Sequence, residues 1–320
     1  MRGRFAPSPT GDLHLGGAFT ALAAWLRARA SGGVLVVRME DLDPPRTVAG
    51  AADRILDDLG WLGLEGDEGP RVGGPYAPYV QSARNPRYAE AIDRLRAAGL
   101  VYPCTCSRAE IARASSAPHA GEEGPRYPGT CRDPKNRRSD RPAALRLRVP
   151  DDARRVVSFV DVVAGACEED VAATVGDFVL QRADGVASYQ LAVVVDDLAM
   201  RIDEVVRGDD LLPSTARQIL LARLLGGAPP RHVHLPMVRG PDGERLAKRH
   251  QSRWRGSTIA ELRADGLDAA TLVGELAAGL GLLAAPRPST LAALTRIAEE
   301  SWAIPTTPWT PSSELLRPRE

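Results

Sequence analysis

The sequence predicts an α/β protein with a doubly wound parallel sheet, an inserted subdomain and a small helical region towards its C-terminal end. Three observations predict this fold. Strand and helix patterns alternate over the first 100 residues, which is typical of a parallel sheet covered by helices. A segment rich in Cys, Pro, Gly and Ser then interrupts the alternation, and Ala/Leu-rich helical patterns follow residue 252. Such a sheet is Rossmann-like.

Each element of the first half follows from its local pattern. Residues 2–6 form the first predicted strand, and residues 15–31 form an Ala/Leu-rich helix that ends at Gly32 and Gly33. The segment "GVLVVRMED" is apolar on both faces, as a buried strand is. Helical spacing returns in "TVAGAADRILDDLGWLGL" and in "RNPRYAEAIDRLRAAG". We therefore assign residues 1–100 to the first half of the sheet domain.

The region 101–188 has the pattern of an insertion between the two halves of the sheet. It opens with "YPCTCSRAEI", continues through a polar stretch, and contains the short predicted strands "ALRLRV" and "VVSFVDVVAG". Strand, turn, strand and helix are predicted in "SYQLAVVVDDLAMRIDEVVRGDDLLPSTARQILLARLLG", and "HVHLP" predicts a further strand before a loop. We assign residues 189–252 to the second half of the sheet domain and residues 253–320 to the C-terminal helical region.

The composition excludes several classes of protein. Lys plus Arg and Asp plus Glu both total 41, so the 320-residue chain has a net charge of zero and no general attraction to nucleic acid is indicated. No apolar run approaches the length of about 18 residues that a membrane span requires. The first residues lack the apolar core of a signal peptide, and four cysteines are too few for a disulfide framework. We expect a cytoplasmic, monomeric protein that contacts no membrane.

The turn between the first strand and the first helix carries an unusual set of residues, "RFAPSPTGDLHLGGAFTAL", at 4–22. A strand that turns sharply into a helix exposes the helix N-terminus, whose free N–H groups attract phosphate. Gly11, Gly16 and Gly17 let a ligand approach the backbone. His14 can donate a hydrogen bond to a phosphate oxygen and stabilise charge that grows during displacement. A rigid loop with a satisfied histidine is the alternative interpretation.

Three of the four cysteines lie close together in the sequence. Cys104 and Cys106 form a Cys-x-Cys pair, and Cys131 follows. Three thiolates suit a tetrahedral zinc ion, and His119 is an ordinary fourth ligand on chemical grounds. Three unrelated thiols are the alternative. Cys167 lies far along the chain and is expected to be a small buried residue.

Two segments carry a resemblance to a known family. The stretch "PSPTGDLHLGG" resembles the HIGH signature of class I aminoacyl-tRNA synthetases, and "RFAPSPTG" resembles the form of glutamyl-type enzymes. The stretch "RLAKR", residues 245–249, resembles their KMSKS loop. Lys248 matches the second lysine and Arg245 keeps the charge of the first, whereas Ala247 and Arg249 replace two serines. Two matching signatures are more specific than either one.

The resemblance implies ATP-dependent activation of L-glutamate, with Mg²⁺ accompanying ATP and no need for a general base. His14 and Lys248 would be catalytic. It also implies which residues bind each substrate. Glutamate would contact Arg4, Phe5, Ala6, Pro7, Ser8, Glu40, Tyr189 and Arg207, and ATP would contact His14, Gly16, Gly17, Arg245 and Lys248. Which arginine binds the side-chain carboxylate is left open.

The resemblance also implies one structural zinc ion per chain. Shorter glutamyl-type relatives use a Cys-x-Cys pair followed by Tyr-x3-Cys, and the spacing from Tyr127 to Cys131 matches that pattern. The implied ligands are therefore Cys104, Cys106, Tyr127 and Cys131. His119 stays open as the fourth ligand in place of Tyr127.

The length after the second signature narrows the expected acceptor. Only 72 residues follow Lys248 (320 − 248), whereas glutamyl-tRNA synthetases continue into a large anticodon-binding domain. The resemblance therefore points to truncated members of the family. These transfer glutamate to queuosine, a modified base in the anticodon of tRNA-Asp, so the anticodon stem-loop would be the RNA partner. The basic stretch "CRDPKNRRSDR" is either an RNA contact or a solvated loop.

Two other functions are weighed against this one. A short glutamyl-tRNA synthetase would charge a tRNA 3′ end, and the missing anticodon domain argues against it. A non-enzymatic RNA-binding paralogue with a decayed site is the other alternative. The presence of His14, Lys248 and the glutamate-pocket residues argues against decay.

Overall fold

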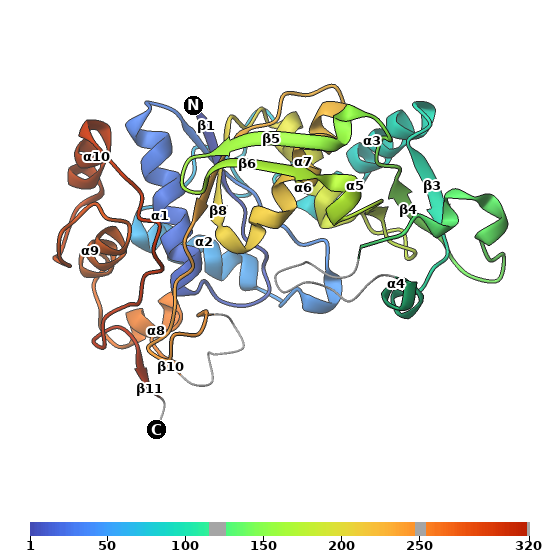
Figure 1. Cartoon of the computed structure of the whole chain (residues 1–320). Helices are drawn as coiled ribbons and strands as arrows, with labels where there is room; N and C mark the ends of the chain where they lie inside the picture. The colour runs from blue at the N-terminus through green and yellow to red at the C-terminus, as the bar shows by residue number, and fades with distance from the viewer. Residues whose placement is uncertain (115–125, 247–253, 319–320) are drawn as a thin grey trace.

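The computed structural model describes residues 1–114, 126–246 and 254–318. A six-stranded sheet in the order β2-β1-β8-β9-β5-β6 forms its centre (Figure 1). The strands are β1 (Arg2–Phe5), β2 (Val34–Val37), β5 (Val156–Asp161), β6 (Gly165–Asp170), β8 (Glu204–Gly208) and β9 (Arg231–Leu235). All neighbours pair in parallel except β5 and β6, which are antiparallel. The predicted α/β class is confirmed, with a mixed and mainly parallel sheet.

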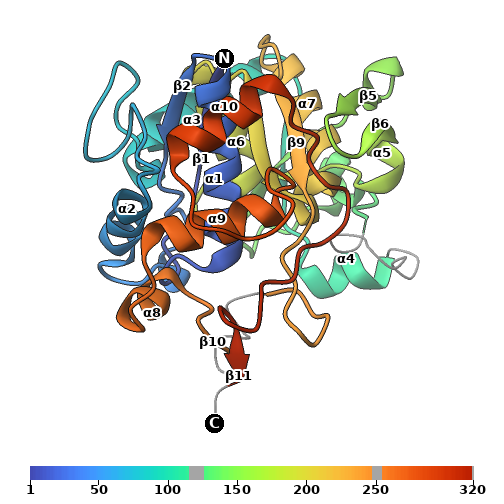
Figure 2. The same ribbon diagram turned by 90° about the vertical axis from the view of Figure 1, so that its left-hand side faces the viewer.

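Helices cover both faces of the sheet. The helices are α1 (Leu15–Ala30), α2 (Ala51–Leu62), α3 (Asn85–Ala97), α6 (Tyr189–Ala199), α7 (Thr215–Leu224), α9 (Ala269–Gly279) and α10 (Leu291–Glu300). Helix α1 packs on β1, β2 and β8, and α9 and α10 pack on α1, as Figure 2 shows. Val37 and Val206 belong to that core, whereas Val36 and Val205 of the same strands face the opposite side. Helices α3, α6 and α7 share a second core.

The elements predicted within residues 1–100 are confirmed. Strand β1, helix α1, strand β2 and helices α2 and α3 all fall within the predicted segments. Helix α1 is rich in glycine and alanine, and these small residues allow close packing on the sheet and on α10. Its last turn is followed by Gly32 at φ = 60°, a left-handed conformation that glycine adopts without strain.

The segment predicted as a strand in "SYQLAVVVDD" is a helix, α6, and that prediction is wrong. Ser188 caps its N-terminus by accepting a hydrogen bond from the Leu191 N–H at 3.3 Å. The valine run is buried, and a fully apolar run does not distinguish a buried strand from a buried helix. Asp196 and Asp197 near its end are buried and paired with arginines of distant segments, which a local pattern does not reveal.

The region 101–188 divides between two sheets. A three-stranded antiparallel sheet contains β3 (Val101–Cys104), β4 (Ala144–Leu147) and β7 (Val179–Gln181), with the helix α4 (Arg108–Ala114) after β3. It lies at the end of the molecule opposite α9 and α10 (Figure 1). Strands β5 and β6, predicted within the insertion, instead extend the main sheet, and the short helix α5 (Val171–Thr174) follows them. Val157 and Asp161 on the inner side of β5 are buried.

The C-terminal region returns to the turn between β1 and α1. It contains α8 (Ile259–Ala264) and a two-stranded sheet of β10 (Trp254–Arg255) and β11 (Arg317–Pro318). The Leu15 N–H at the start of α1 donates to the Ser257 carbonyl at 3.1 Å, so this region fixes the turn. Within the described ranges, the longest apolar helices fall short of what a bilayer crossing needs.

Candidate active site

A cavity of about 720 Å³ lies at the carboxyl ends of β2, β1, β8 and β9. In an open parallel sheet, ligands bind at this edge, where neighbouring strands are followed by elements that diverge. Every described residue predicted to bind glutamate or ATP lines this one cavity. These are Arg4, Phe5, Ala6, Pro7, Ser8, His14, Gly16, Gly17, Glu40, Tyr189, Arg207 and Arg245. Residues far apart in the sequence thus meet at one place.

Two predicted residues lie outside the described part of the chain. Lys248 and His119 fall in 247–253 and 115–125. Arg245, which precedes the first of these ranges, lines the cavity and forms an ion pair with Asp210 at 2.9 Å. A cation therefore stands at the cavity wall where the second signature begins.

His14 is the residue immediately before α1. Its backbone is extended, and its Nδ1 accepts a hydrogen bond from the Gly17 N–H at 3.0 Å. A neutral imidazole that accepts at Nδ1 carries its proton on Nε2, so Nε2 is the donor of this side chain. Gly16 leaves room for the ring, because a Cβ there would meet the imidazole at a tight 3.2 Å. His14 thus caps the helix and lines the cavity with a single ring.

Arg4 is a buried guanidinium with spare donors. Its side chain is almost fully enclosed, yet among the residues that the structure describes it donates only to the Val206 carbonyl, at 3.2 Å from Nη1. Its Nε has no hydrogen-bond acceptor among the described residues, and the Asp197 carboxylate lies 3.6 Å away. A buried polar group without a partner is costly unless a ligand supplies one. Arg4 is therefore suited to an anionic ligand.

Glu40 lines the cavity and pairs with an arginine of a buried network of ion pairs. Its carboxylate accepts from Arg38 at 3.1 Å, and Arg38, which is fully buried, also donates to Asp197 at 2.7 Å. Burial raises the pKa of Glu40 above its usual value, and Arg38 and Arg4 offset part of that rise. A ligand ammonium group at this carboxylate would stabilise its charged form further.

Arg207 has more partners than Arg4 has. It is buried, and it donates to His234 Nε2 at 2.9 Å, to Gln218 Oε1 at 2.7 Å and to Thr215 Oγ1 at 2.8 Å. The Leu211 carbonyl lies 3.2 Å from Nη2. Tyr189, at the start of α6, is 36% exposed on the cavity wall and interacts with Arg207. These hydrogen bonds fix the guanidinium of Arg207 at the cavity.

Several residues of the site were missed by sequence reasoning. Asp12 and Met237 line the cavity, while Arg38, Asp197 and His234 lie behind it and hold its charged residues. The strand "HVHLP" carries one local signal, because alternate residues of a strand face the same side and His234 is next to the strand end. Asp196 and Asp197, the partners of Arg38 that come from α6, have no local signal.

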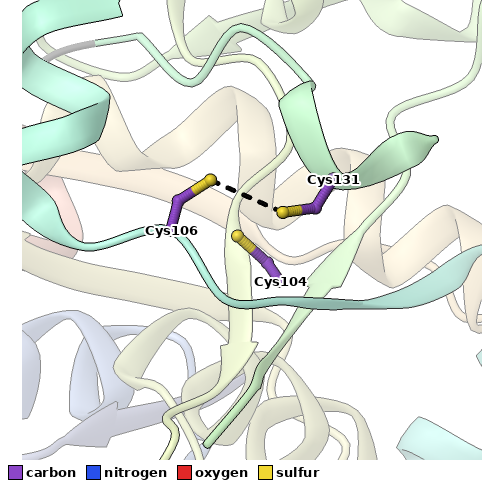
Figure 3. A group of neighbouring side chains, drawn as sticks. All are labelled: Cys104, Cys106 and Cys131. Carbon is purple, nitrogen blue, oxygen red and sulfur yellow. Dashed lines mark hydrogen bonds between the residues drawn. The ribbon is translucent and has the colours of Figure 1, made fainter. Parts of the chain in front are cut away.

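The three predicted cysteine ligands come together in the structure (Figure 3). The sulfur atoms of Cys104, Cys106 and Cys131 all lie within 4.8 Å of one another, and those of Cys106 and Cys131 are 3.5 Å apart. The Tyr127 hydroxyl lies 3.3 Å from Cys104 Sγ and 3.7 Å from Cys106 Sγ. Cys167 is half-buried on β6 and lies outside this cluster.

The electrostatics of the cysteine cluster differ between its members. Burial raises the pKa of Cys106 to about 12. Burial opposes ionisation of Cys131 as well, but hydrogen bonds from the Thr105 backbone and from Tyr127 lower the pKa of Cys131 to about 7. Thiolates are the metal-binding form, and a bound cation would favour them in all three residues. The donor set of this cluster fits a metal ion.

Comparison of the sequence with known proteins shows the family to which this chain belongs. Residues 1–277 match the family of class I tRNA synthetases (E and Q), catalytic domain. Two relatives, from Symbiobacterium thermophilum and Burkholderia cenocepacia, are each 50% identical to this chain, over 293 and 304 residues. The matches cover 89% and 94% of this chain and 88% and 96% of the relatives. Both are named glutamyl-Q tRNA(Asp) synthetase.

A solved structure is similar over nearly the whole chain. It is a glutamate tRNA ligase from Elizabethkingia meningosepticum in complex with its amino acid, with a TM-score of 0.81 and 27% sequence identity. The match covers 98% of this chain and 67% of that one.

Proposed function

Because this chain belongs to the catalytic-domain family of class I tRNA synthetases for glutamate and glutamine, we propose that it activates L-glutamate with ATP, without tRNA, and transfers it to the queuosine base of tRNA-Asp. The single observation that carries the proposal is the cavity at the strand ends, where the described residues of both signatures meet. The names of relatives that are half identical over most of both chains support the acceptor.

Glutamate recognition requires cationic donors for two carboxylates and an acceptor for one ammonium group. Arg4 is the proposed main carboxylate ligand, because its guanidinium is buried and has spare donors. Arg207 adds positive charge from the neighbouring strand. Glu40 is the proposed partner of the ammonium group, because Arg38 already holds its carboxylate in place. Ser8 and Tyr189 complete the wall around the amino acid.

Activation is a displacement at phosphorus. A carboxylate oxygen of glutamate bonds to the α-phosphorus of ATP as the bond to pyrophosphate breaks, so no proton needs to be removed. Such a step depends on positioning and on stabilisation of the developing charge. Three groups on the cavity wall can stabilise this charge. They are the Nε2–H of His14, the N-terminus of α1 beside Gly16 and Gly17, and the side chain of Arg245. Lys248 is proposed to add a further cation, and Mg²⁺ accompanies the phosphates.

Transfer uses the same site with a different nucleophile. Queuosine carries a cyclopentenediol whose vicinal hydroxyls resemble the 2′,3′-diol of a terminal ribose. One of its hydroxyl oxygens bonds to the glutamyl carbonyl carbon as the bond from that carbon to the AMP oxygen breaks, and the products are the ester, AMP and the proton of the hydroxyl group. An anticodon stem-loop and an acceptor stem are both short A-form helices that end in accessible nucleotides. A catalytic domain of this family can therefore present either one to the adenylate.

The first expected result concerns activation. Exchange of pyrophosphate into ATP should require glutamate and should proceed without tRNA, because the cavity contains donors for both substrates. Aspartate should be a poor substrate, because a shorter side chain would leave buried donors unpaired. The measurement is pyrophosphate exchange with each amino acid. Equal exchange with aspartate, or a strict need for tRNA, would contradict the proposal.

A structural zinc ion is also part of the proposal. Cys104, Cys106 and Cys131 would bind it as thiolates, with Tyr127 as the fourth ligand, because their donor atoms already converge. We expect one zinc per chain by metal analysis, and we expect Cys131→Ser to lose most of it. Cys167→Ser is the matched control and should keep it, because Cys167 lies outside the cluster.

The zinc prediction has a clear contrary outcome. Chelation should lower the melting temperature of the unaltered protein, because a structural metal contributes to folding. Metal content near zero, together with a melting temperature that chelators do not change, would mean that the three thiols are ordinary core residues.

A further inference from the structure

A chain of polar contacts crosses three neighbouring strands and ends at the cavity. Asp161 ends β5, His234 lies on β9, and Arg207 lies on β8 directly opposite His234 in the register. His234 Nδ1 is 2.7 Å from Asp161 Oδ2, and His234 Nε2 is 2.9 Å from Arg207 Nε. All three side chains are almost fully buried. Their order is fixed by the sheet, since β5 pairs with β9 and β9 pairs with β8.

Arg207 and Asp161, which contact the two ring nitrogens of His234, determine the protonation state of that histidine. The guanidinium of Arg207 has only donors, so His234 Nε2 must be an unprotonated acceptor. Burial opposes ionisation of Asp161, but His234 and the two N–H groups of Ala164 and Val163 outweigh burial and lower the pKa of Asp161 to about 2, which favours the carboxylate. An ionised carboxylate only accepts, so His234 Nδ1 must carry the proton. One neutral tautomer satisfies both contacts.

The surroundings favour the same neutral form. Burial lowers the pKa of His234, and the positive charge of Arg207 acts in the same direction, although Asp161 opposes them. The ring of His232 stacks on that of His234, with centroids 5.9 Å apart, and burial lowers the pKa of His232 to about 3. A second proton on His234 would place an N–H against an N–H of Arg207. The contacts around His234 therefore fix its neutral Nδ1–H tautomer.

We propose that Asp161 and His234 form a positioning pair, in which Asp161 orients His234 and His234 orients Arg207 for binding of the amino-acid substrate. Without the acceptor at His234 Nε2, the Nε side of the guanidinium would lose its only contact on β9 among the described residues. The planar guanidinium of arginine gives its interactions with carboxylates a geometric specificity, so a change in the orientation of Arg207 should weaken its interaction with the substrate. This inference rests on the proposed function for the identity of the substrate.

Two substitutions of His234 separate its two nitrogens. In His234→Asn, the amide reaches the Nδ1 position, so the contact to Asp161 is kept and the acceptor for Arg207 is lost. In His234→Gln, the amide reaches the Nε2 position, so an acceptor for Arg207 is kept. We expect His234→Asn to raise the KM for glutamate on the order of tenfold or more, with the KM for ATP changed by less than about threefold. His234→Gln should recover most of the loss.

Controls separate positioning from general damage. His232→Asn alters a buried histidine of the same strand that stacks on His234, and it should leave the KM for glutamate within about threefold of the unaltered value. A structural role would instead raise the KM for glutamate and the KM for ATP equally, in His234→Asn and in His234→Gln alike, together with a lowered melting temperature. That result would overturn the proposal. No change in either variant would overturn it as well.

A measurement that needs no activity tests the same inference. The nitrogen chemical shifts of the His234 ring in this 320-residue chain should show a protonated Nδ1 and an unprotonated Nε2 from pH 6 to pH 8. The Nε2–H tautomer, or a doubly protonated ring, would overturn the proposal. Absence of glutamate-dependent exchange in the unaltered chain would instead contradict the proposed function, and the ring measurement would still decide the network.

Discussion

Arg4→Lys is expected to raise the KM for glutamate on the order of 100-fold or more while the KM for ATP stays nearly constant. The lysine keeps the charge, but it does not present two parallel N–H donors to a carboxylate. Arg4 is enclosed at the end of β1 and has spare donors, so the loss falls on the ligand. Pyrophosphate exchange at varied glutamate and ATP concentrations measures both constants.

The matched control is Arg2→Lys on the same strand. Arg2 donates to the Met200 carbonyl at 2.6 Å and pairs with Glu68, and it is absent from the cavity wall. Arg2→Lys should leave the KM for glutamate almost unchanged even if it lowers the melting temperature. If the two substitutions affect that KM equally, Arg4 is not a carboxylate ligand.

Lys248→Ala should lower the rate of glutamate activation on the order of 100-fold with little change in the KM for glutamate. The proposed role of Lys248 is to neutralise charge that develops on the leaving pyrophosphate, and an interaction of that kind acts on the transition state and not on the bound substrate. Single-turnover formation of glutamyl-adenylate, followed over a range of glutamate concentrations, separates the two effects.

The chain supplies its own control for this substitution. Its other lysine is Lys135, which lies in a short helical turn after Cys131 and does not line the cavity. Lys135→Ala should leave the activation rate unchanged. A loss of glutamate affinity alone in Lys248→Ala would show that "RLAKR" is not the phosphate loop.

Sequence reasoning reached much of the fold because the informative signals were local. The Gly-rich turn at residues 4–22 and the strand and helix beside it follow from spacing and from helix-end chemistry. The convergence of Cys104, Cys106 and Cys131 could also be expected, because short spacing and a shared ligand chemistry limit the alternatives.

The remaining parts depend on contacts between distant segments. The sequence of α6 predicted a strand because it contains an uninterrupted run of valines. In the structure this run is buried, and the two aspartates after it, Asp196 and Asp197, pair with Arg84 and Arg38 of distant segments. Strand β5 looked like part of an insertion, whereas Asp161 at its end pairs with His234 across the main sheet. Such pairings are decided by tertiary packing, which overrides local pattern.

The acceptor of the activated glutamate is the central claim, and one measurement tests it directly. Labelled glutamate is offered with ATP to tRNA-Asp that contains queuosine and lacks its 3′-terminal adenosine, and to the same trimmed tRNA with unmodified guanosine. We predict label on the first RNA and none on the second, because the cyclopentenediol replaces the terminal ribose as the nucleophile. Transfer that requires the terminal adenosine, and occurs regardless of queuosine, would contradict the account and identify an enzyme that charges the tRNA 3′ end.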